Sequence, residues 1–230
     1  MIVGKTKVRV REIERRIVRL FGGRSSRDVE YDFAYRNVNR KRLCILDIGG
    51  CDSLIPLVLS RAGHKVTVYD FRPYTERHRN LKVICGDFMK NQLPPKSFDI
   101  VLLISTIEHM GFGAYGVPEY KDADFEVMSH LRRVLIDGGK LVLTFPFNEK
   151  EKIIPGFERW YSVDRIKKLL TGWFVVDVEF WAPDKKVFGR WLKWGPATWD
   201  GAGRAYIEKG VQGVACFAIT NQPCNWGMSR

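Results

Sequence analysis

The stretch LCILDIGGCDSLIPLVLSRAGHKVTVYD (43–70) decides the fold of this chain. It begins with a continuous apolar run, 43–48, of the kind that lies in the middle of a parallel sheet. Two glycines follow at 49–50, then a helical segment at about 53–61, and then a second strand-like run, 65–70, which ends in an aspartate. A strand, a glycine turn, a helix and a second strand with an acidic end together predict a nucleoside-binding βαβ unit.

The rest of the chain continues this alternation. Further strands are predicted at 81–87, 98–105, 140–147, 173–181 and 213–220, and further helices at 123–135 and 163–170. A long connection rich in Gly, Pro, Lys and Trp, at about 183–212, separates the last two strands. We therefore expect an α/β fold: a Rossmann-like, doubly wound, mostly parallel sheet with an antiparallel last strand and helices on both faces.

The N-terminal part of the chain is strongly basic. Residues 1–42 hold 13 Lys and Arg and 5 Asp and Glu, so that +8 of the formal net charge of +12 lies there. Apolar residues at helical spacing predict a basic helix over 8–21 and a second helix over 27–38. Such a segment either docks on phosphates or an acidic membrane surface, or is a solvated helix face. We expect residues 1–42 to be a helical extension of one domain at 43–230.

Cysteine usage and hydropathy suggest the compartment. The five cysteines include no CxxC pair, so we expect no structural zinc; Cys44 and Cys85 lie in apolar runs, where we expect reduced core thiols. No apolar run approaches the roughly 20 residues of a membrane span. No apolar segment follows the N-terminal basic residues as it does in a secretory signal. These features predict a soluble, cytoplasmic protein.

The glycine turn distinguishes two classes of nucleoside ligand. A dinucleotide-binding oxidoreductase needs G-x-G-x-x-G to admit a pyrophosphate, and residues 49–54 read GGCDSL, without the second and third glycines. Asp52 would also repel a diphosphate. A cofactor without phosphate, such as S-adenosylmethionine, fits better, because Asp47 and Asp52 tolerate its cationic groups.

At this level the sequence resembles the class I S-adenosylmethionine-dependent methyltransferases, and more narrowly the small methyltransferase-domain proteins of glycan and cell-surface biosynthesis. The resemblance covers about 31–182 and rests on the order of LDIGG (46–50), VYDFRPY (68–74), ICGDF (84–88), SFDIVLLISTIEHMGFGAYG (97–116), LRRVLIDGGKLVLTFPF (131–147) and RWYSVDRIKKLL (159–170). It implies that S-adenosylmethionine is the cofactor and that 43–230 is the domain that binds it. The glycine turn departs from the family pattern, since Cys51 and Ser53 replace commoner glycines.

The resemblance also assigns roles to individual residues. It places Asp47 and Gly49 near the methionine part of the cofactor and Ile104 and Ser105 along the methionine backbone. It places Asp70 at the ribose, and Asp87 and Phe88 at the adenine. Gly50 and Phe71 are further candidates for binding the cofactor. Asp99 lies at the other end of its strand, away from the edge where ligands bind, and we interpret it as structural.

The segment STIEHMGFGAYG (105–116) follows the fourth predicted strand, where the transferred group should lie. A hydroxyl acceptor needs a base with a pKa near neutrality, and histidine fits that requirement. His109 is therefore the candidate general base, and Glu108 is the candidate for orienting His109 or the acceptor. The alternative is that His109 only lines the pocket and that Glu108 pairs within the fold. The glycines and Tyr115 of this segment predict a loop that closes on an acceptor.

Several hypotheses about the function stay open. The leading one is O-methylation of a hydroxyl on a sugar, a glycan precursor or a small molecule. The basic N-terminus and the Trp- and Lys-rich connection favour an RNA methyltransferase instead, with nucleic acid as partner. Two further hypotheses are a cofactor-binding module without catalysis and a nicotinamide oxidoreductase. The tryptophans at 181, 191, 194 and 199 either pack in the protein or contact a substrate or partner.

Overall fold

In the computed structural model, residues 19, 23–90, 93–113, 120, 122–187 and 190–223 are described. Within these residues one large sheet has the strand order β3-β2-β1-β4-β5-β10-β8-β9. Its strands are β1 (Cys44–Ile48), β2 (Lys65–Asp70), β3 (Leu81–Cys85), β4 (Phe98–Ile104), β5 (Leu135–Phe147), β8 (Phe174–Val187), β9 (Arg190–Ala197) and β10 (Gly213–Thr220). The strands that the sequence predicts thus form a single sheet.

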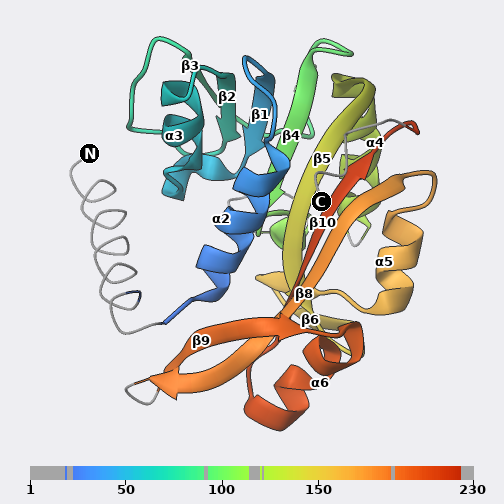
Figure 1. Ribbon diagram of the computed structural model, residues 1–230. Coiled ribbons are helices and arrows are strands. Elements are labelled where there is room, and N and C mark those ends of the chain that lie inside the picture. The colour runs from blue at the N-terminus through green and yellow to red at the C-terminus, as the bar shows by residue number, and fades with distance from the viewer. Residues whose placement is uncertain are drawn as a thin grey trace.

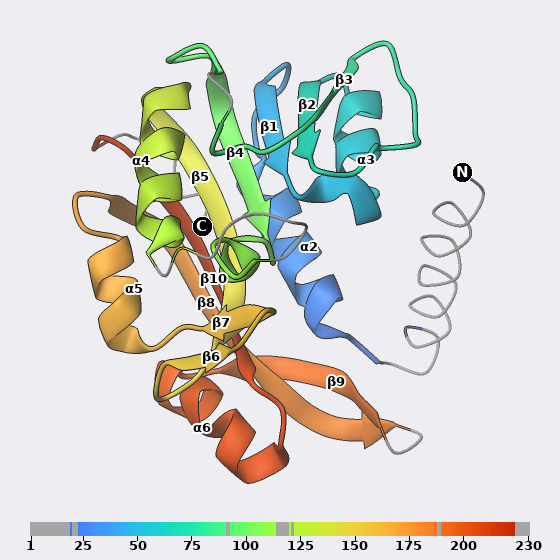
Figure 2. The ribbon, with the colours of Figure 1, turned by 180° about the vertical axis from the view of Figure 1, so that it is seen from behind.

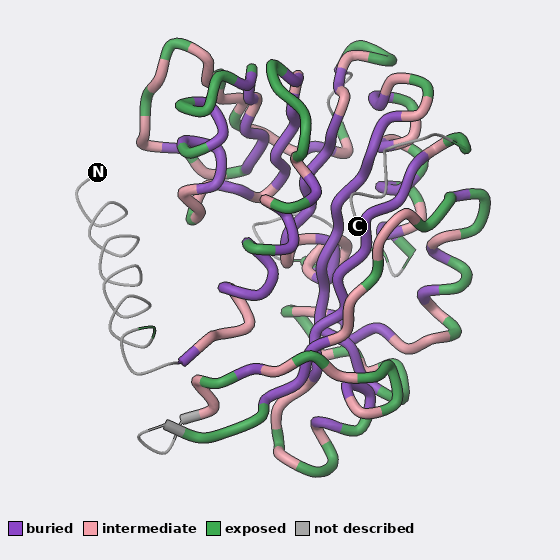
Figure 3. The backbone as a smooth tube through the Cα atoms, viewed as in Figure 1, coloured by how far each residue is buried: buried purple, intermediate pink, exposed green. Residues whose placement is uncertain are grey.

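The strand directions confirm the predicted fold class. β1 pairs in parallel with β2 and β4, and the parallel pairing continues to β3 on one side and β5 on the other. β10 runs antiparallel to both β5 and β8. Because β1, β4 and β5 are central, their side chains are almost all buried, as the purple tube of Figure 3 shows. This explains why these strands read as continuous apolar runs.

Helices cover both faces of the sheet (Figures 1 and 2). α2 (Ser26–Asn37) and α3 (Ile55–Arg61) share one buried apolar cluster with one face of β1, β4 and β10. α4 (Ala123–Val134) and α5 (Val163–Leu169) share a second cluster with the opposite face. The predicted helices are therefore confirmed within the described residues, and the helix expected at 8–21 lies outside them except for Arg19.

The start of α2 is fixed by a capping box. The backbone N–H of Asp28 donates to the Ser25 hydroxyl at 3.2 Å, and the backbone N–H of Ser25 donates to the Asp28 carboxylate at 2.9 Å. This exchange satisfies two donors that a helix start leaves open. It also fixes the start of the helix that carries Arg27, Glu30 and Tyr31.

The C-terminal part departs from the sequence prediction. β5 begins at Leu135 rather than at the predicted residue 140, because residues 136–139 form an irregularity within the strand: Phe98 opposes Leu135, and Ile100 opposes Lys140. The expected long connection at 183–212 contains β9 and the helix α6 (Trp199–Lys209). A small hairpin of β6 (Lys152–Ile154) and β7 (Glu158–Trp160) was also not predicted.

Some of the tryptophans and cysteines discussed in the sequence analysis are buried in the structure, and others are exposed. Trp181 and Trp194 are buried in the cluster beneath α2, which confirms packing for these two, whereas Trp199 is exposed. Trp191 is half-buried, and its ring N–H donates to the Lys209 carbonyl at 3.1 Å. The prediction of a core position for Cys85 is wrong: β3 is the edge strand, and Cys85 at its end is exposed.

Two further features concern Asp99 and membrane spans. The structural interpretation of Asp99 is confirmed, because its carboxylate accepts the backbone N–H of Cys44 at 2.7 Å between β1 and β4. Among the described helices, none is long and apolar enough to cross a bilayer.

Candidate functional site

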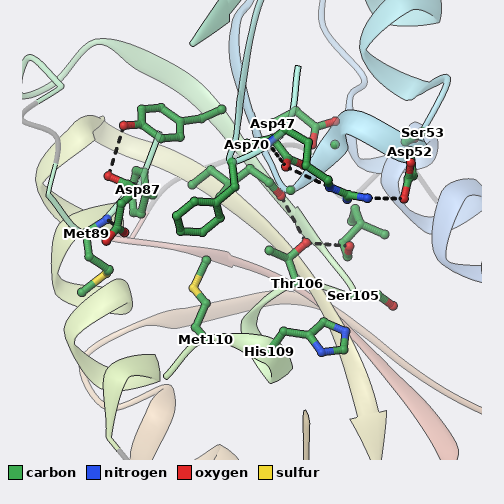
Figure 4. Close-up of a pocket in the computed structure, with 18 of the residues that line it drawn as sticks. Asp47, Asp52, Ser53, Asp70, Asp87, Met89, Ser105, Thr106, His109 and Met110 are labelled. Atoms are coloured by element: carbon green, nitrogen blue, oxygen red, sulfur yellow. Dashed lines mark hydrogen bonds and ion pairs between the residues drawn. The ribbon is translucent and has the colours of Figure 1, made fainter. Parts of the chain in front are cut away.

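A cavity of about 410 Å³ lies at the carboxyl ends of β1, β2 and β4 (Figure 4). Its volume is in the range of small-molecule and cofactor sites. Its wall includes all nine residues predicted to bind cofactor: Asp47, Gly49, Gly50, Asp70, Phe71, Asp87, Phe88, Ile104 and Ser105. His109 also lines it, whereas Glu108 is not part of the wall. The chain therefore brings the predicted site together at one sheet edge.

The glycine turn after β1 leaves no room for side chains. Gly49 has a φ of +79°, and a Cβ on it would lie 2.4 Å from the Thr106 hydroxyl. A Cβ on Gly50 would lie 2.4 Å from a carboxylate oxygen of Asp47. Glycine is required at Gly49 because Thr106, after β4, comes close to it, and at Gly50 because the Asp47 side chain lies against it. The cavity floor is accordingly bare backbone, which suits close approach of a ligand.

Asp47 is a buried carboxyl at the end of β1. Its burial, and secondarily the negative charge of Asp70, raise the pKa of Asp47 to about 8. Loss of water penalises the charged form of a carboxyl, which accounts for the direction. Asp47 will therefore gain most from a ligand that brings a positive charge beside it.

Asp70 at the end of β2 is held by backbone N–H groups. One carboxylate oxygen accepts the N–H of Cys51 at 3.1 Å, and the other accepts the N–H of Arg72 at 2.9 Å. A carboxylate has about four acceptor sites, so each oxygen retains capacity for another donor. Asp52, which the sequence analysis expected to repel a diphosphate, forms an ion pair with Arg72 at 2.9 Å, and its charge is therefore partly offset.

The turn after β3 contributes Asp87 and Phe88. Asp87 accepts the backbone N–H of Met89 at 3.0 Å, and the ammonium of Lys90 lies 3.7 Å from its other oxygen. Phe88 is only 5% exposed and packs edge-on against Tyr69, so most of its ring belongs to the core. Phe71, in contrast, is 41% exposed and lines the cavity. Phe71 is thus the better placed of these two rings to stack on a ligand.

The segment after β4 is tied to α2 by a buried polar cluster that the sequence did not predict. Glu30 is 2% exposed; it accepts the Thr144 hydroxyl at 2.8 Å and also the Ser105 hydroxyl. Arg27 lies 3.3 Å from the same carboxylate and lines the cavity. Ser105 has a φ of +43°, a strained conformation for a residue with a side chain, and this cluster holds it there.

His109 ends the short helical turn η2 (Ile107–His109). In Figure 4 its ring lies beside Met110, and Thr106 lies between it and the side of the cavity that carries Asp47 and Asp70. Its Nδ1 is 2.8 Å from the carbonyl oxygen of Phe157, and the two rings meet edge-on with centroids 5.1 Å apart. The partner of His109 is therefore a main-chain carbonyl from the turn between β6 and β7.

Glu108 does not line the cavity. It is 2% exposed, and one of its carboxylate oxygens has no hydrogen-bond partner in the described part of the chain. Burial, and secondarily the charge of Glu30, raise the pKa of Glu108 well above its usual range. The expected contact between Glu108 and His109 is not among the hydrogen bonds of the described residues, because Phe157 occupies the Nδ1 side of the ring.

The predicted acceptor loop is described only at its ends. Gly111 and Tyr120 meet through a hydrogen bond from the Tyr120 N–H to the Gly111 carbonyl at 2.9 Å. Both line the cavity. Tyr115 and Gly116, which the sequence suggested as part of a closing loop, lie outside the described residues.

Comparison with known protein families shows which family the chain is similar to. Residues 46–143 match the family described as a methyltransferase domain. This segment runs from β1 to β5 and contains the glycine turn, Asp70 and Asp87. These residues thus form a methyltransferase domain, as the resemblance to the class I S-adenosylmethionine-dependent methyltransferases implied. No curated protein matches the sequence of this methyltransferase.

Solved structures resemble this methyltransferase at low sequence identity. The (4+2)-cyclase SpnF is 16% identical, over 85% of this chain and 81% of that one, with a TM-score of 0.59. The 1,6-didemethyltoxoflavin-N1-methyltransferase of Burkholderia thailandensis, crystallised with S-adenosylhomocysteine, is 11% identical over 84% and 76%, with a TM-score of 0.56. The phosphoethanolamine N-methyltransferase 2 of Haemonchus contortus is 17% identical over 85% and 53%, with a TM-score of 0.57. At these identities the likeness shows the shared fold.

Proposed function

We propose that this methyltransferase binds S-adenosylmethionine in the cavity at the carboxyl ends of β1, β2 and β4 and methylates a hydroxyl group of a sugar, a glycan precursor or another small molecule. The observation that carries the proposal is the position of His109. It is a titratable ring in the same cavity as Asp47 and Asp70, but it follows β4 and lies on the opposite side from them.

The residues of the cavity fit the cofactor. The bare turn at Gly49 and Gly50 allows the methionine part to lie against backbone, and Asp47 gains a positive neighbour there. The remaining acceptor sites of Asp70 suit two ribose hydroxyls. Asp87 and Phe71 provide an acceptor and an exposed ring for the adenine. When bound, the cofactor supplies an electrophilic methyl group.

His109 is proposed as the general base for the acceptor. Methyl transfer mainly requires positioning of the nucleophile, and a hydroxyl gains further from a base that removes its proton. With Nδ1 facing the Phe157 carbonyl, Nε2 is the nitrogen that can take this proton. Glu108 is proposed to position the segment 105–109, and with it His109, from the buried side of that segment.

The acceptor class rests on the family resemblance to methyltransferases of glycan and cell-surface biosynthesis. The two similar methyltransferase structures carry names that describe N-methylation. An amine that is already neutral would need no base, and a hydroxyl would. The requirement for His109 therefore separates the two acceptor classes.

The experiment that tests the proposal is acceptor profiling with methyl-labelled S-adenosylmethionine. The purified protein is offered panels of sugar hydroxyls, other small-molecule hydroxyls, amines and RNA, and labelled products are identified by mass spectrometry. We expect a methyl ether. Labelled amines or RNA with no methyl ether would contradict the hydroxyl acceptor, and cofactor binding without any product would favour a module that only binds the cofactor.

A further inference from the structure

The contact between His109 and the turn after β6 fixes the chemistry of the imidazole. A carbonyl oxygen accepts hydrogen bonds and cannot donate, so at 2.8 Å from Phe157 the Nδ1 atom of His109 must carry the hydrogen. In the neutral ring the other nitrogen, Nε2, then has the free lone pair. The nitrogen that carries the proton is therefore set by a segment 48 residues away in the sequence.

We propose that the turn between β6 and β7 is the positioning element of His109, in which the Phe157 carbonyl holds the ring in its Nδ1–H tautomer and leaves Nε2 to accept the proton of the substrate. This inference rests on the proposed function, because it supplies the orienting partner that a general base needs. The Phe157 ring supports the same orientation by its edge-on contact with the imidazole.

The turn is well anchored for such a role. The backbone N–H of Phe157 donates to the Ile154 carbonyl at 3.0 Å, which closes the hairpin turn, and Gly156 within it has a φ of +68°. On β7, Arg159 is 1% exposed and is paired with Glu151. After β7, the N–H of Tyr161 donates to the Pro146 carbonyl at 2.9 Å, which ties the hairpin to β5. The hairpin that carries Phe157 is thus tied at its base to β5 of the central sheet.

A carbonyl partner has a definite consequence during proton transfer. When Nε2 takes the hydroxyl proton, both ring nitrogens carry hydrogen and the ring becomes positively charged. The Nδ1–H bond to Phe157 then becomes a charge-assisted hydrogen bond, which is stronger than the neutral one. The turn therefore stabilises the protonated ring without placing a second negative charge beside the cavity.

The direct test is the tautomer of His109 in the wild-type protein, measured by long-range ¹H–¹⁵N correlation NMR on histidine-labelled full chain. The four histidines are few enough to assign, and the His109→Gln variant identifies the signal. We expect a protonated Nδ1 and an unprotonated Nε2 at a pH where the ring is neutral. A proton on Nε2, or rapid exchange between the two tautomers, would overturn the proposal.

A matched pair of variants at Gly156 tests the function of the turn. Gly156→Pro cannot keep a φ of +68°, because proline fixes φ near −65°, whereas Gly156→Asn can, and a Cβ at this position meets open space. We expect Gly156→Pro to lose the Nδ1–H tautomer and to lower kcat by about 10- to 100-fold with unchanged cofactor affinity, as misplacement of a catalytic group does. Gly156→Asn should keep both. If His109 has the same tautomer in both variants and kcat is also the same, the turn does not position His109.

These outcomes separate this inference from the proposed function. If His109→Ala keeps full turnover, His109 is not a base, whatever its tautomer. If His109→Ala is inactive while wild-type His109 carries its proton on Nε2, the base stands and the role of the Phe157 carbonyl falls. Should Gly156→Pro fail to fold, the wild-type tautomer still decides the question.

Discussion

The two ends of the cavity are built in different ways. At the proposed nucleoside end, Asp70 and Asp87 lie in one continuous stretch, 51–89, which also supplies the N–H groups that they accept. At the proposed acceptor end, α2 and the segment after β4 line the cavity, and the turn between β6 and β7 contacts His109 from outside it. The nucleoside end is therefore a local unit, and the acceptor end depends on how distant segments pack.

This difference has a functional meaning. A local unit can stay the same while the rest of the chain changes, which suits a cofactor shared by many enzymes. An end made from three segments changes shape with each of them, which suits a variable acceptor. Substitutions at the nucleoside end should therefore alter cofactor affinity, and substitutions at the acceptor end should alter turnover.

The largest expected effect is at the acceptor end. His109→Ala should lower kcat by about 10²–10⁴-fold, the usual contribution of a positioned base, with cofactor affinity nearly unchanged. Turnover is measured with labelled cofactor and the acceptor found by profiling, and affinity by calorimetry. Near-normal turnover across pH would mean that His109 lines the cavity without acting as a base. Loss of cofactor binding would mean that substitutions at one end of the cavity also affect the other end.

The next effect is at the nucleoside end. Asp70→Ala should weaken S-adenosylhomocysteine binding by about 5- to 150-fold, equivalent to about 1–3 kcal/mol for buried polar partners left without an acceptor. Asp99→Ala is the matched control, because Asp99 also accepts a backbone N–H but at the other end of the sheet. It should lower the melting temperature and leave the dissociation constant unchanged. The same change in affinity for both variants would place the effect in the fold rather than in the site.

Asp47 gives a pH dependence. In the unfolded chain its pKa is near 3.8, and burial raises it to about 8 in the folded protein. Between these values the folded state holds the extra proton, so Asp47 makes the ligand-free protein less stable as the pH rises, by at most about 1.4 kcal/mol per unit. Asp47→Asn removes this pH-dependent loss of stability. The free energy of unfolding of the variant, relative to that of the wild type, should therefore rise from pH 5 to 8 and level off above pH 8. Measured by denaturant unfolding, a difference that does not depend on pH would contradict the raised pKa of Asp47.

The smallest effect is expected from the basic N-terminus. Deletion of residues 1–23 should leave the sheet folded, because α2 begins at Ser26 and carries its own capping box. The loss of the Arg19–Asp28 ion pair should cost about 1 kcal/mol or less. Thermal unfolding and turnover check this. A collapse of turnover, or RNA binding that falls steeply with salt and disappears on deletion, would instead give this segment a role in the acceptor end.

The two ends also differ in how far the sequence predicts them. The 43–70 stretch carries its own signals: β2 spans 65–70 as predicted, and all nine predicted cofactor residues line the cavity. These signals are local, because a glycine turn and an acidic strand end act within a few residues. Whether each residue contacts the cofactor stays a prediction, as does the division of the chain at residue 42.

The acceptor end could be predicted only in part. His109 was placed correctly beside the cavity, since it follows β4 directly. Its partner Phe157 could not be foreseen, because a backbone carbonyl has no signature in the sequence and its hairpin is only three residues on each side. Glu30 was missed for a similar reason: it reads as a surface charge on a helix, and only packing of α2 on β4 and β5 buries it.

The central claim is that the cavity at Asp47, Asp70 and Asp87 is the binding site for S-adenosylmethionine. Calorimetric titration of the wild-type protein with S-adenosylmethionine, S-adenosylhomocysteine and NAD tests it most directly. We predict that both sulfur compounds bind at one site per chain, that Asp70→Ala weakens both, and that NAD gives little or no heat. Tight binding of NAD without a response to either sulfur compound would contradict it.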